Sequence, residues 1–240
     1  MTEMPPGTGS LDLGLEARGL APAPGKKKNG LFAVVMVVWV IALGFCWGLL
    51  LEYSAVSGTP AAAPGMWPAA ASFELDRSSP TLVMVAHPHC SCTRASIAEL
   101  SRLMTRLQGQ VQGHVIFVVP EGLEQDWEQT DLWQSATIID GVQVHKDPKG
   151  ALADAFGSFT SGQTLLYSAS GELLFAGGLT ATRSHEGNSV GRERIIDLVT
   201  SGSSDRAESA VYGCALREFD EHRARSTLER FEFEGLSGNK

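Results

Sequence analysis

Residues 81–107 read TLVMVAHPHCSCTRASIAELSRLMTRL. The first six residues are apolar and lie between two prolines, a pattern that predicts a short buried strand. From Thr93 to Leu107 the apolar residues recur with the spacing of one helical face, which predicts an amphipathic helix. Cys90 and Cys92 therefore lie where a strand ends and a helix begins.

The elements that follow predict the rest of the fold. We expect a second buried strand at 114–119, a polar helix at 121–136, a hairpin of strands at 163–167 and 172–176, and a short helix at 191–200. Two parallel strands need a helical crossover, and a hairpin extends a sheet antiparallel. Strand, helix, strand, helix, hairpin and helix is the order of a thioredoxin-like α/β fold, a central mixed sheet flanked by helices.

An uncharged apolar run precedes this domain. Residues 31–51, LFAVVMVVWVIALGFCWGLLL, are long enough to cross a bilayer as a single transmembrane helix. A buried soluble helix would have a polar face, which this run lacks. A signal peptide has a shorter apolar core, although residues 54–57 would permit cleavage.

The charges that flank the run predict its orientation. Lys26, Lys27 and Lys28 precede it and Glu52 follows it. Positive residues are retained on the cytoplasmic side, so we expect a single-pass protein of the cell membrane with a cytoplasmic N-terminus. The C-terminal domain is then extracytoplasmic, as in a bacterial periplasm, where conditions are oxidising.

Composition completes the predicted organisation of the 240 residues. The net charge of -8 and the scarcity of clustered basic residues argue against a nucleic-acid partner. The predicted parts are a disordered cytoplasmic tail (1–30), the transmembrane helix (31–51), a Pro- and Ala-rich linker (52–72), the thioredoxin-like domain (73–202) and a charged C-terminal tail with a helix (203–240).

The two cysteines at the helix start are the predicted reactive groups. Free N–H groups and the helix dipole favour a thiolate there, and a thiolate is the species that attacks a disulfide. Cys90 and Cys92 are separated by one residue, so a disulfide between them would close a small, strained ring. His87 and His89 can add positive charge or accept a proton.

Two further features leave alternatives open. Cys214 lies beyond the predicted domain and can resolve a disulfide with Cys90 or Cys92, supply a metal ligand or bridge to another chain. The loop that holds Arg183 and His185 follows the last strand, at the sheet edge where the helix begins. Either side chain can support the thiols there, or the loop can simply be solvated.

The same cluster also fits a metal. Two thiols and two imidazoles, those of Cys90, Cys92, His87 and His89, lie within six residues. Soft sulfur suits copper(I), and the mixed set suits zinc. His114, His145 and His222 have no assigned partner, and we interpret them as structural or exposed.

With these residues in view, the chain resembles the RedB-like family of membrane-attached thioredoxin-fold proteins. The resemblance is carried by residues 81–83, 87–92, 96–100, 161–167, 175–180, 183–187 and 212–214. It implies a thioredoxin fold and a redox role, and it implies no substrate. Thioredoxins have a cis-proline before the hairpin, which helps to bind peptide and keeps metals from the thiols. Here Ser161-Gly162-Gln163-Thr164 occupies that place.

Three functions remain from the sequence. The first is a membrane-tethered thiol–disulfide oxidoreductase that needs no cofactor and acts on a protein thiol or disulfide partner. Its catalytic residues would be Cys90, Cys92 and Cys214, supported by His87, His89, Arg183 and His185. The second is a carrier of copper or zinc, and the third is a non-catalytic interaction module.

Overall fold

The computed structural model describes residues 30–120, 126–202 and 207–216, in two units that meet at residues 47 and 48. Helix α1, Gly30–Ala55, is the one helix of the described residues that is long and apolar enough to cross a membrane, judged by length and composition. The predicted N-terminal tail and the predicted helix of the C-terminal tail fall almost wholly outside the described residues.

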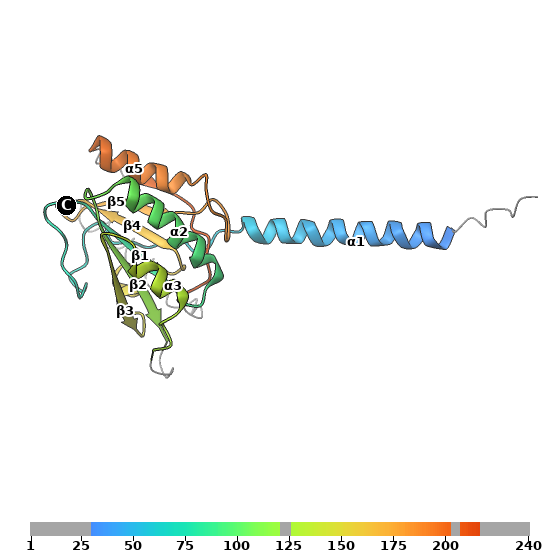
Figure 1. Ribbon diagram of the computed structural model, residues 1–240, viewed down its shortest axis with the longest axis horizontal. Coiled ribbons are helices and arrows are strands. Elements are labelled where there is room, and N and C mark those ends of the chain that lie inside the picture. The colour runs from blue at the N-terminus through green and yellow to red at the C-terminus, as the bar shows by residue number, and fades with distance from the viewer. Residues whose placement is uncertain (1–29, 121–125, 203–206, 217–240) are drawn as a thin grey trace, which may run out of the picture. The chain divides into compact units, whose positions relative to one another are not determined.

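The second unit contains a six-stranded mixed sheet in the order β3-β2-β1-β4-β5-β6 (Figure 1). Strand β1 is central, parallel to β2 and antiparallel to β4, and β5 pairs antiparallel with β4. This order and these directions confirm the predicted thioredoxin-like fold. The strands are β1 (Thr81–Ala86), β2 (Gln112–Val119), β3 (Val142–Pro148), β4 (Gln163–Tyr167), β5 (Leu173–Gly178) and β6 (Ala207–Glu208).

Each face of the sheet has its own apolar core. Helices α2 (Ser91–Arg106), α3 (Asp131–Thr137) and α5 (Val190–Ser201) cover one face, where Leu82 and Met84 of β1 are completely buried. Val83 and Val85 point to the other face, which the short helix α4 (Ala151–Ala155) covers. Strand β1 is buried on both sides, as its continuous apolar run predicts.

Strand β3 and helix α4, which lie between β2 and the hairpin, were not predicted from the sequence. Strand β3 is an edge strand, and its residues are mostly half-buried or exposed, so it lacks the apolar run that identifies β1. Asp147, at its end, is buried, and its carboxylate accepts hydrogen bonds of 2.9 Å from the N–H groups of Leu152 and Ala153. These bonds cap α4.

Part of the predicted linker, residues 52–72, lies along the α4 face of the sheet. The N–H of Ala62 donates to the carbonyl of Gly157 at 2.9 Å, and Trp67 packs edge-on against Phe156 and Tyr167. Gly157 has φ +59°, and a Cβ there would lie 2.0 Å from the carbonyl oxygen of Ala62. Gly157 therefore lets the segment pack closely on the domain, which the composition of the segment alone does not predict.

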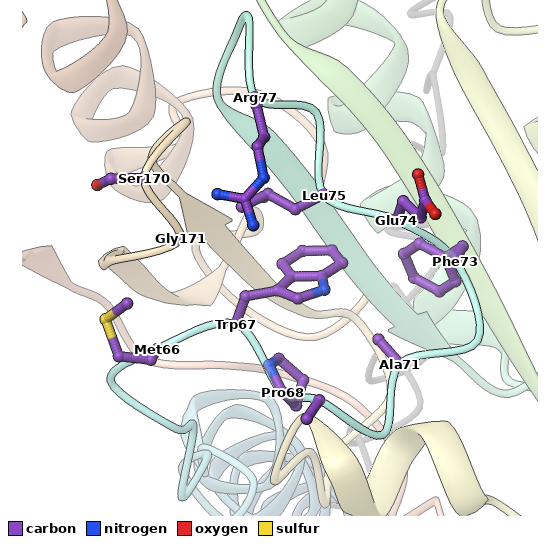
Figure 2. A pocket seen from close by; sticks show the side chains of 11 residues that line it. Met66, Trp67, Pro68, Ala71, Phe73, Glu74, Leu75, Arg77, Ser170 and Gly171 are labelled. Atoms are coloured by element: carbon purple, nitrogen blue, oxygen red, sulfur yellow. The ribbon is translucent and has the colours of Figure 1, made fainter.

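The same segment frames a pocket of about 540 Å³ beside the β4–β5 turn (Figure 2). Trp67, Phe73 and Leu75 provide its apolar wall, and Arg77 points toward the indole. Because β1 begins near this turn and the thiols follow its other end, the pocket lies at the opposite end of the sheet from Cys90.

His114 and His145, which the sequence left without partners, contact each other on adjacent strands. His114 Nδ1 lies 2.8 Å from His145 Nε2, and Phe73 stacks on both rings. Burial, and then the charge of His145, lowers the pKa of His114 from 6.5 to about 4. Burial also lowers the pKa of His145. The folded domain therefore keeps this pair neutral.

We predict that the pair makes the domain acid-sensitive. The unfolded chain protonates His114 near pH 6.5, whereas the folded chain does so near pH 4, so stability is lost as the pH falls between these values. A difference of one in pKa corresponds to about 1.4 kcal/mol, so the full difference between the folded and unfolded pKa of His114 should remove roughly 3 kcal/mol. Urea titrations of the detergent-solubilised chain at several pH values measure this loss.

His114→Gln removes the titrating group and should flatten the stability curve between pH 6.5 and 4. Since carboxylates also titrate in this range, the difference between the variant and the parent is the quantity to compare. The matched control is His185→Gln, because His185 is exposed. Equal slopes for both variants would contradict the assignment.

Candidate functional site

Cys90 lies where β1 gives way to α2, as the sequence predicts. It is the N-cap of α2, with extended backbone angles of φ -86° and ψ 117°. Its N–H donates to the carbonyl of His87, and its own carbonyl accepts from the N–H of Thr93 at 3.0 Å. The sulfur is therefore held at the positive end of a helix, where a thiolate is favoured.

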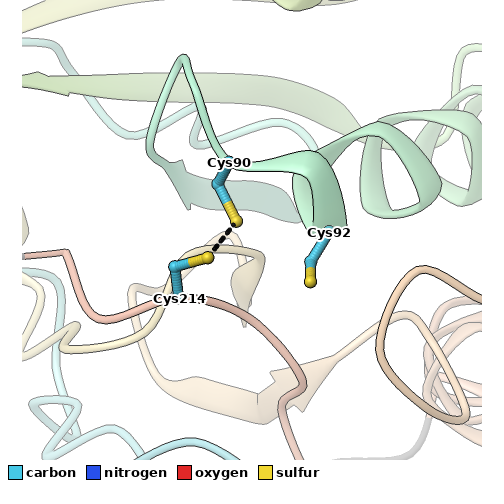
Figure 3. A group of neighbouring side chains, drawn as sticks. All are labelled: Cys90, Cys92 and Cys214. Atoms are coloured by element: carbon cyan, nitrogen blue, oxygen red, sulfur yellow. Dashed lines mark hydrogen bonds between the residues drawn. The ribbon is translucent and has the colours of Figure 1, made fainter. Parts of the chain in front are cut away.

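Three sulfurs meet at this helix start (Figure 3). Cys90 Sγ and Cys214 Sγ are 2.9 Å apart, although the two residues are 124 positions apart in the chain. Cys92 Sγ lies within 4.8 Å of both. Cys90 and Cys92 are 3% and 7% exposed, whereas Cys214 is exposed to solvent. The close pair is thus Cys90 with Cys214, and the accessible member of that pair is Cys214.

The contact polarises the two thiols in opposite directions. Burial by itself raises the pKa of Cys90, but hydrogen bonds from Cys214 and Thr93 outweigh it, so this pKa lies below its ordinary value of 9.0. Burial, together with the hydrogen bond to Cys90 and the charges of Cys90 and Cys92, raises the pKa of Cys214 to about 12. Cys90 is therefore the first of the two thiols to ionise, and Cys214 keeps its proton to higher pH.

Backbone pairing brings Cys214 to this position. The chain before it runs beside β5, and Ala215 forms an antiparallel bridge with Thr160. The N–H of Ser161 donates to the carbonyl of Cys214 at 2.8 Å. A Cβ on Gly213 would lie 1.9 Å from the carbonyl oxygen of Ser161, so the segment can approach this closely because residue 213 is glycine.

Ser161 joins the pieces of the site. Its hydroxyl accepts from the N–H of His87 at 2.8 Å and lies 2.6 Å from Thr93 Oγ1. It is completely buried, in the segment that replaces the cis-proline of thioredoxins. The described residues contain no cis peptide bond. A serine at this place therefore bonds to both ends of the Cys90 loop and to the strand of Cys214.

The two histidines have partners other than the sulfurs. His89 Nε2 lies 3.0 Å from the carbonyl oxygen of Trp127, and its ring packs on that indole at 4.3 Å. His87 Nδ1 accepts from the N–H of His89, and burial, followed by the charge of His89, lowers the pKa of His87. Within the described chain, the group of side chains whose ligand atoms all lie within 4.8 Å of one another, and which could hold a metal ion, consists of the three cysteines.

The loop after β5 reaches the sulfurs through Arg183, one of the two residues expected there, and through Ser184, which was not expected. Arg183 Nη1 donates to the carbonyl of Gly213 at 2.8 Å, and its charge acts to lower the pKa of Cys214. The hydroxyl of Ser184 donates to Cys92 Sγ at 3.4 Å. His185 is exposed, and among the described contacts its backbone N–H bonds to Thr182. Arg183 therefore belongs beside the site, and His185 faces solvent.

A buried carboxylate holds this loop in place. Glu99, on α2, is completely buried and forms ion pairs with Arg102 and Arg192. The N–H of Gly187 donates to Glu99 Oε1 at 2.6 Å. Ser184 has φ 55°, an uncommon conformation for a residue with a side chain. Because Glu99 binds both α5 and the loop, it fixes the segment that contacts Cys92.

Several of these residues could not be recognised from the sequence as parts of the site. Ser161 and Gly213 belong to the blocks that carry the family resemblance, but no local pattern marks them as neighbours of Cys90. Glu99 occupies a position on the predicted helix to which the apolar spacing assigns no role. The missing proline at residues 161–164 was the one available signal for Ser161.

Comparison with known proteins bears on the fold. No protein-family model and no curated protein match the sequence. An uncharacterised conserved protein from Geobacillus kaustophilus is similar in structure, with 16% identity, a TM-score of 0.50, and coverage of 69% of this chain and 94% of that one. At this identity the similarity concerns the fold, not the reaction.

Two further solved structures are similar to a lesser degree. A hypothetical protein from Sinorhizobium meliloti 1021 has 19% identity and a TM-score of 0.49, over 70% of this chain and 97% of that one. The exposed lipoprotein thioredoxin Etrx1 from Streptococcus pneumoniae TIGR4 has 15% identity and a TM-score of 0.39, over 52% and 87% of the two chains.

We predict that Glu99→Gln loosens the loop over Cys92. The substitution removes the charge that binds Arg102, Arg192 and the N–H of Gly187, and losing these charged contacts should cost about 2 kcal/mol of stability. Ser184 then no longer shields Cys92, so iodoacetamide should modify this thiol faster in the reduced protein. Mass spectrometry of the Cys92 peptide measures the rate, and urea titration measures the stability.

Glu193→Gln provides the control. Glu193 also pairs with Arg192, but its side chain is 60% exposed. Its replacement should change stability by less than about 0.5 kcal/mol and leave the Cys92 rate as it was. If Cys92 is modified equally slowly in both variants, Glu99 does not control access to that thiol.

Proposed function

We propose that this chain is a membrane-anchored thiol–disulfide oxidoreductase whose exchanging pair is Cys90 and Cys214. The observation that supports it is the 2.9 Å separation of these two sulfurs at the start of α2. A helix start stabilises the thiolate that must attack or leave during exchange. The neighbouring sulfur is close enough to form or break the disulfide with little movement of the backbone.

The exposure of the two sulfurs sets the order of events. In the oxidised form a partner thiolate attacks Cys214 Sγ, because Cys90 is 3% exposed and Cys214 is accessible. A partner–Cys214 disulfide forms, the Cys90–Cys214 bond breaks, and its electron pair stays on Cys90 Sγ. The second partner thiolate then attacks the mixed disulfide at the partner's own sulfur. Cys214 leaves and takes a proton, and the partner becomes a disulfide.

The reverse sequence of the same steps passes two electrons from the reduced pair to a partner disulfide. Cys214, the accessible sulfur, attacks the partner disulfide and gives up its proton to the partner sulfur that leaves. The Cys90 thiolate at the helix start then attacks Cys214 Sγ, and the second partner sulfur leaves. The partner is thus a protein or peptide with two cysteines near its surface. Steric access selects Cys214 as the sulfur that meets this partner.

The choice of Cys214 over Cys92 as the partner of Cys90 has a physical basis. Cys90 is the N-cap of α2 and Cys92 is its second residue, so a bond between them would distort the helix start. The Cys90–Cys214 bond instead joins two segments that backbone hydrogen bonds already hold together. Cys92 then remains a thiol throughout the exchange.

We infer that α1 tethers this activity to the membrane. The helix has the length and hydropathy of a single span, and three lysines precede it. The positive-inside rule favours a cytoplasmic N-terminus, with the thiols on the oxidising side. The resemblance to RedB-like proteins supports the same placement and the same redox role.

We predict that single cysteine-to-serine variants separate the roles of the three thiols. Cys90→Ser and Cys214→Ser should each slow the oxidation of a dithiol peptide by roughly 100-fold or more, because each removes one half of the disulfide. Cys92→Ser should still form the Cys90–Cys214 disulfide. The measurements are peptide oxidation kinetics and disulfide mapping by mass spectrometry of the full-length protein in detergent.

Cys46→Ser is the control for this series, since Cys46 lies in α1, outside the site. A Cys90–Cys92 disulfide in the parent protein would contradict the proposed pair. So would full activity in Cys214→Ser.

A second prediction leaves every thiol in place. Gly213→Ala introduces a Cβ that would lie 1.9 Å from the carbonyl oxygen of Ser161, so the Cys214 strand must move away. Formation of the Cys90–Cys214 disulfide should slow by roughly 10-fold or more, because the two sulfurs lose their alignment. The rate is measured by adding oxidised glutathione to the reduced protein and alkylating the remaining thiols at successive times.

The matched control is Gly65→Ala, because a Cβ at Gly65 meets no atom within 4 Å. This variant should form the disulfide at the parental rate. A parental rate in Gly213→Ala as well would show that the packing of Gly213 on Ser161 does not position Cys214.

A further inference from the structure

The proposed disulfide exchange between Cys90 and Cys214 does not use Cys92. This thiol is 7% exposed, accepts a hydrogen bond from Ser184 and lies within 4.8 Å of the other two sulfurs. An exchanging pair needs two cysteines, and a third buried thiol beside it can compete for the disulfide. Its place beside the Cys90–Cys214 pair, in one cluster of three sulfurs, points to a second use of the same residues.

The spacing of the sulfurs suits a metal ion. Metal–thiolate bonds are about 2.3 Å long, so three sulfurs in a plane around one ion lie about 4 Å apart. The three sulfurs here all fall within 4.8 Å of one another. Cys90 and Cys214, at 2.9 Å, must separate by about 1 Å, which rotation of the exposed Cys214 side chain can provide.

The composition of the cluster selects the kind of metal. Zinc in a structural site takes four ligands, whereas soft thiolates favour copper(I). The histidines that the sequence offered as ligands bond to each other and to Trp127, and the group of ligand atoms in the described residues is made of sulfur alone. Three thiolates, with no fourth protein ligand among the residues that the structure describes, suit a monovalent soft ion better than a four-coordinate zinc ion.

Nearby positive charge offsets the anionic ligands. Three thiolates around one monovalent cation carry a net charge of -2. Cys90 and Cys92 lie at the N-terminus of α2, where the helix dipole stabilises negative charge. Arg183 donates to the carbonyl of Gly213, next to Cys214, and brings a guanidinium to the third sulfur. The surroundings therefore favour the charged form of this cluster.

We propose that the reduced protein binds one copper(I) ion through Cys90, Cys92 and Cys214. Binding replaces the thiol protons and changes no oxidation state. A Cys90–Cys214 disulfide removes two of the three ligands, so the oxidised protein has no such site. The oxidation state of the pair thereby controls metal binding. This proposal rests on the proposed oxidoreductase in that both use Cys90 and Cys214. Only the metal site also requires Cys92.

The test is an anaerobic copper(I) titration of the reduced full-length protein in detergent, in competition with bicinchoninate. We expect one equivalent of copper(I) for the parent and for the Cys46→Ser control. Cys92→Ser should bind at least roughly 100-fold more weakly, because two thiolates replace three. X-ray absorption of the loaded parent should show three sulfur ligands at about 2.3 Å.

The outcomes separate the two proposals. Disulfide mapping of the same Cys92→Ser sample reports the Cys90–Cys214 bond independently of the metal. Weak copper(I) binding by Cys92→Ser that still forms this bond supports the metal site. Equal binding by Cys92→Ser and the parent, equal binding by the oxidised protein, or a preference for one equivalent of zinc(II) over copper(I) would each overturn it.

Discussion

Ser161 is the residue at which the separate parts of the site are joined. Its hydroxyl bonds to the N–H of His87 and to Thr93, on the two sides of Cys90, and its N–H bonds to the carbonyl of Cys214. A proline at this place would provide neither the N–H nor the hydroxyl. The strand of Cys214 can lie this close because residue 213 is a glycine. The serine thus fixes the geometry in which the distant cysteine meets the helix start.

The parts of the fold that are specified locally could be predicted from the sequence. Strand β1 and helix α2 carry continuous or periodic apolar patterns, and the observed elements begin and end within a few residues of the predicted ones. Strand β3 and α4 could not be found in the same way, because an edge strand needs fewer apolar residues. The packing of residues 58–75 depends on small side chains that also suit a linker.

The site was predictable only in part, for a related reason. Cys90 could be placed at a helix start from a few adjacent residues, but its nearest sulfur is 124 positions away. The apolar periodicity of the sequence does not indicate which residues pair across so many positions. Local reasoning therefore favoured Cys92 and the two histidines, which are close to Cys90 in the chain. The fold instead directs both histidine side chains to Trp127 or to each other.

The proposed disulfide exchange and the proposed metal binding use the same sulfurs, and both need stabilised negative charge there. Exchange requires one stabilised thiolate at the helix start, and metal binding requires three. The α2 N-terminus and Arg183 stabilise negative charge for both purposes. The demands differ in Cys92, which a disulfide between Cys90 and Cys214 leaves unused. Glu99 holds the loop that covers this thiol, so the protection of Cys92 is built into the packing of α2 against α5.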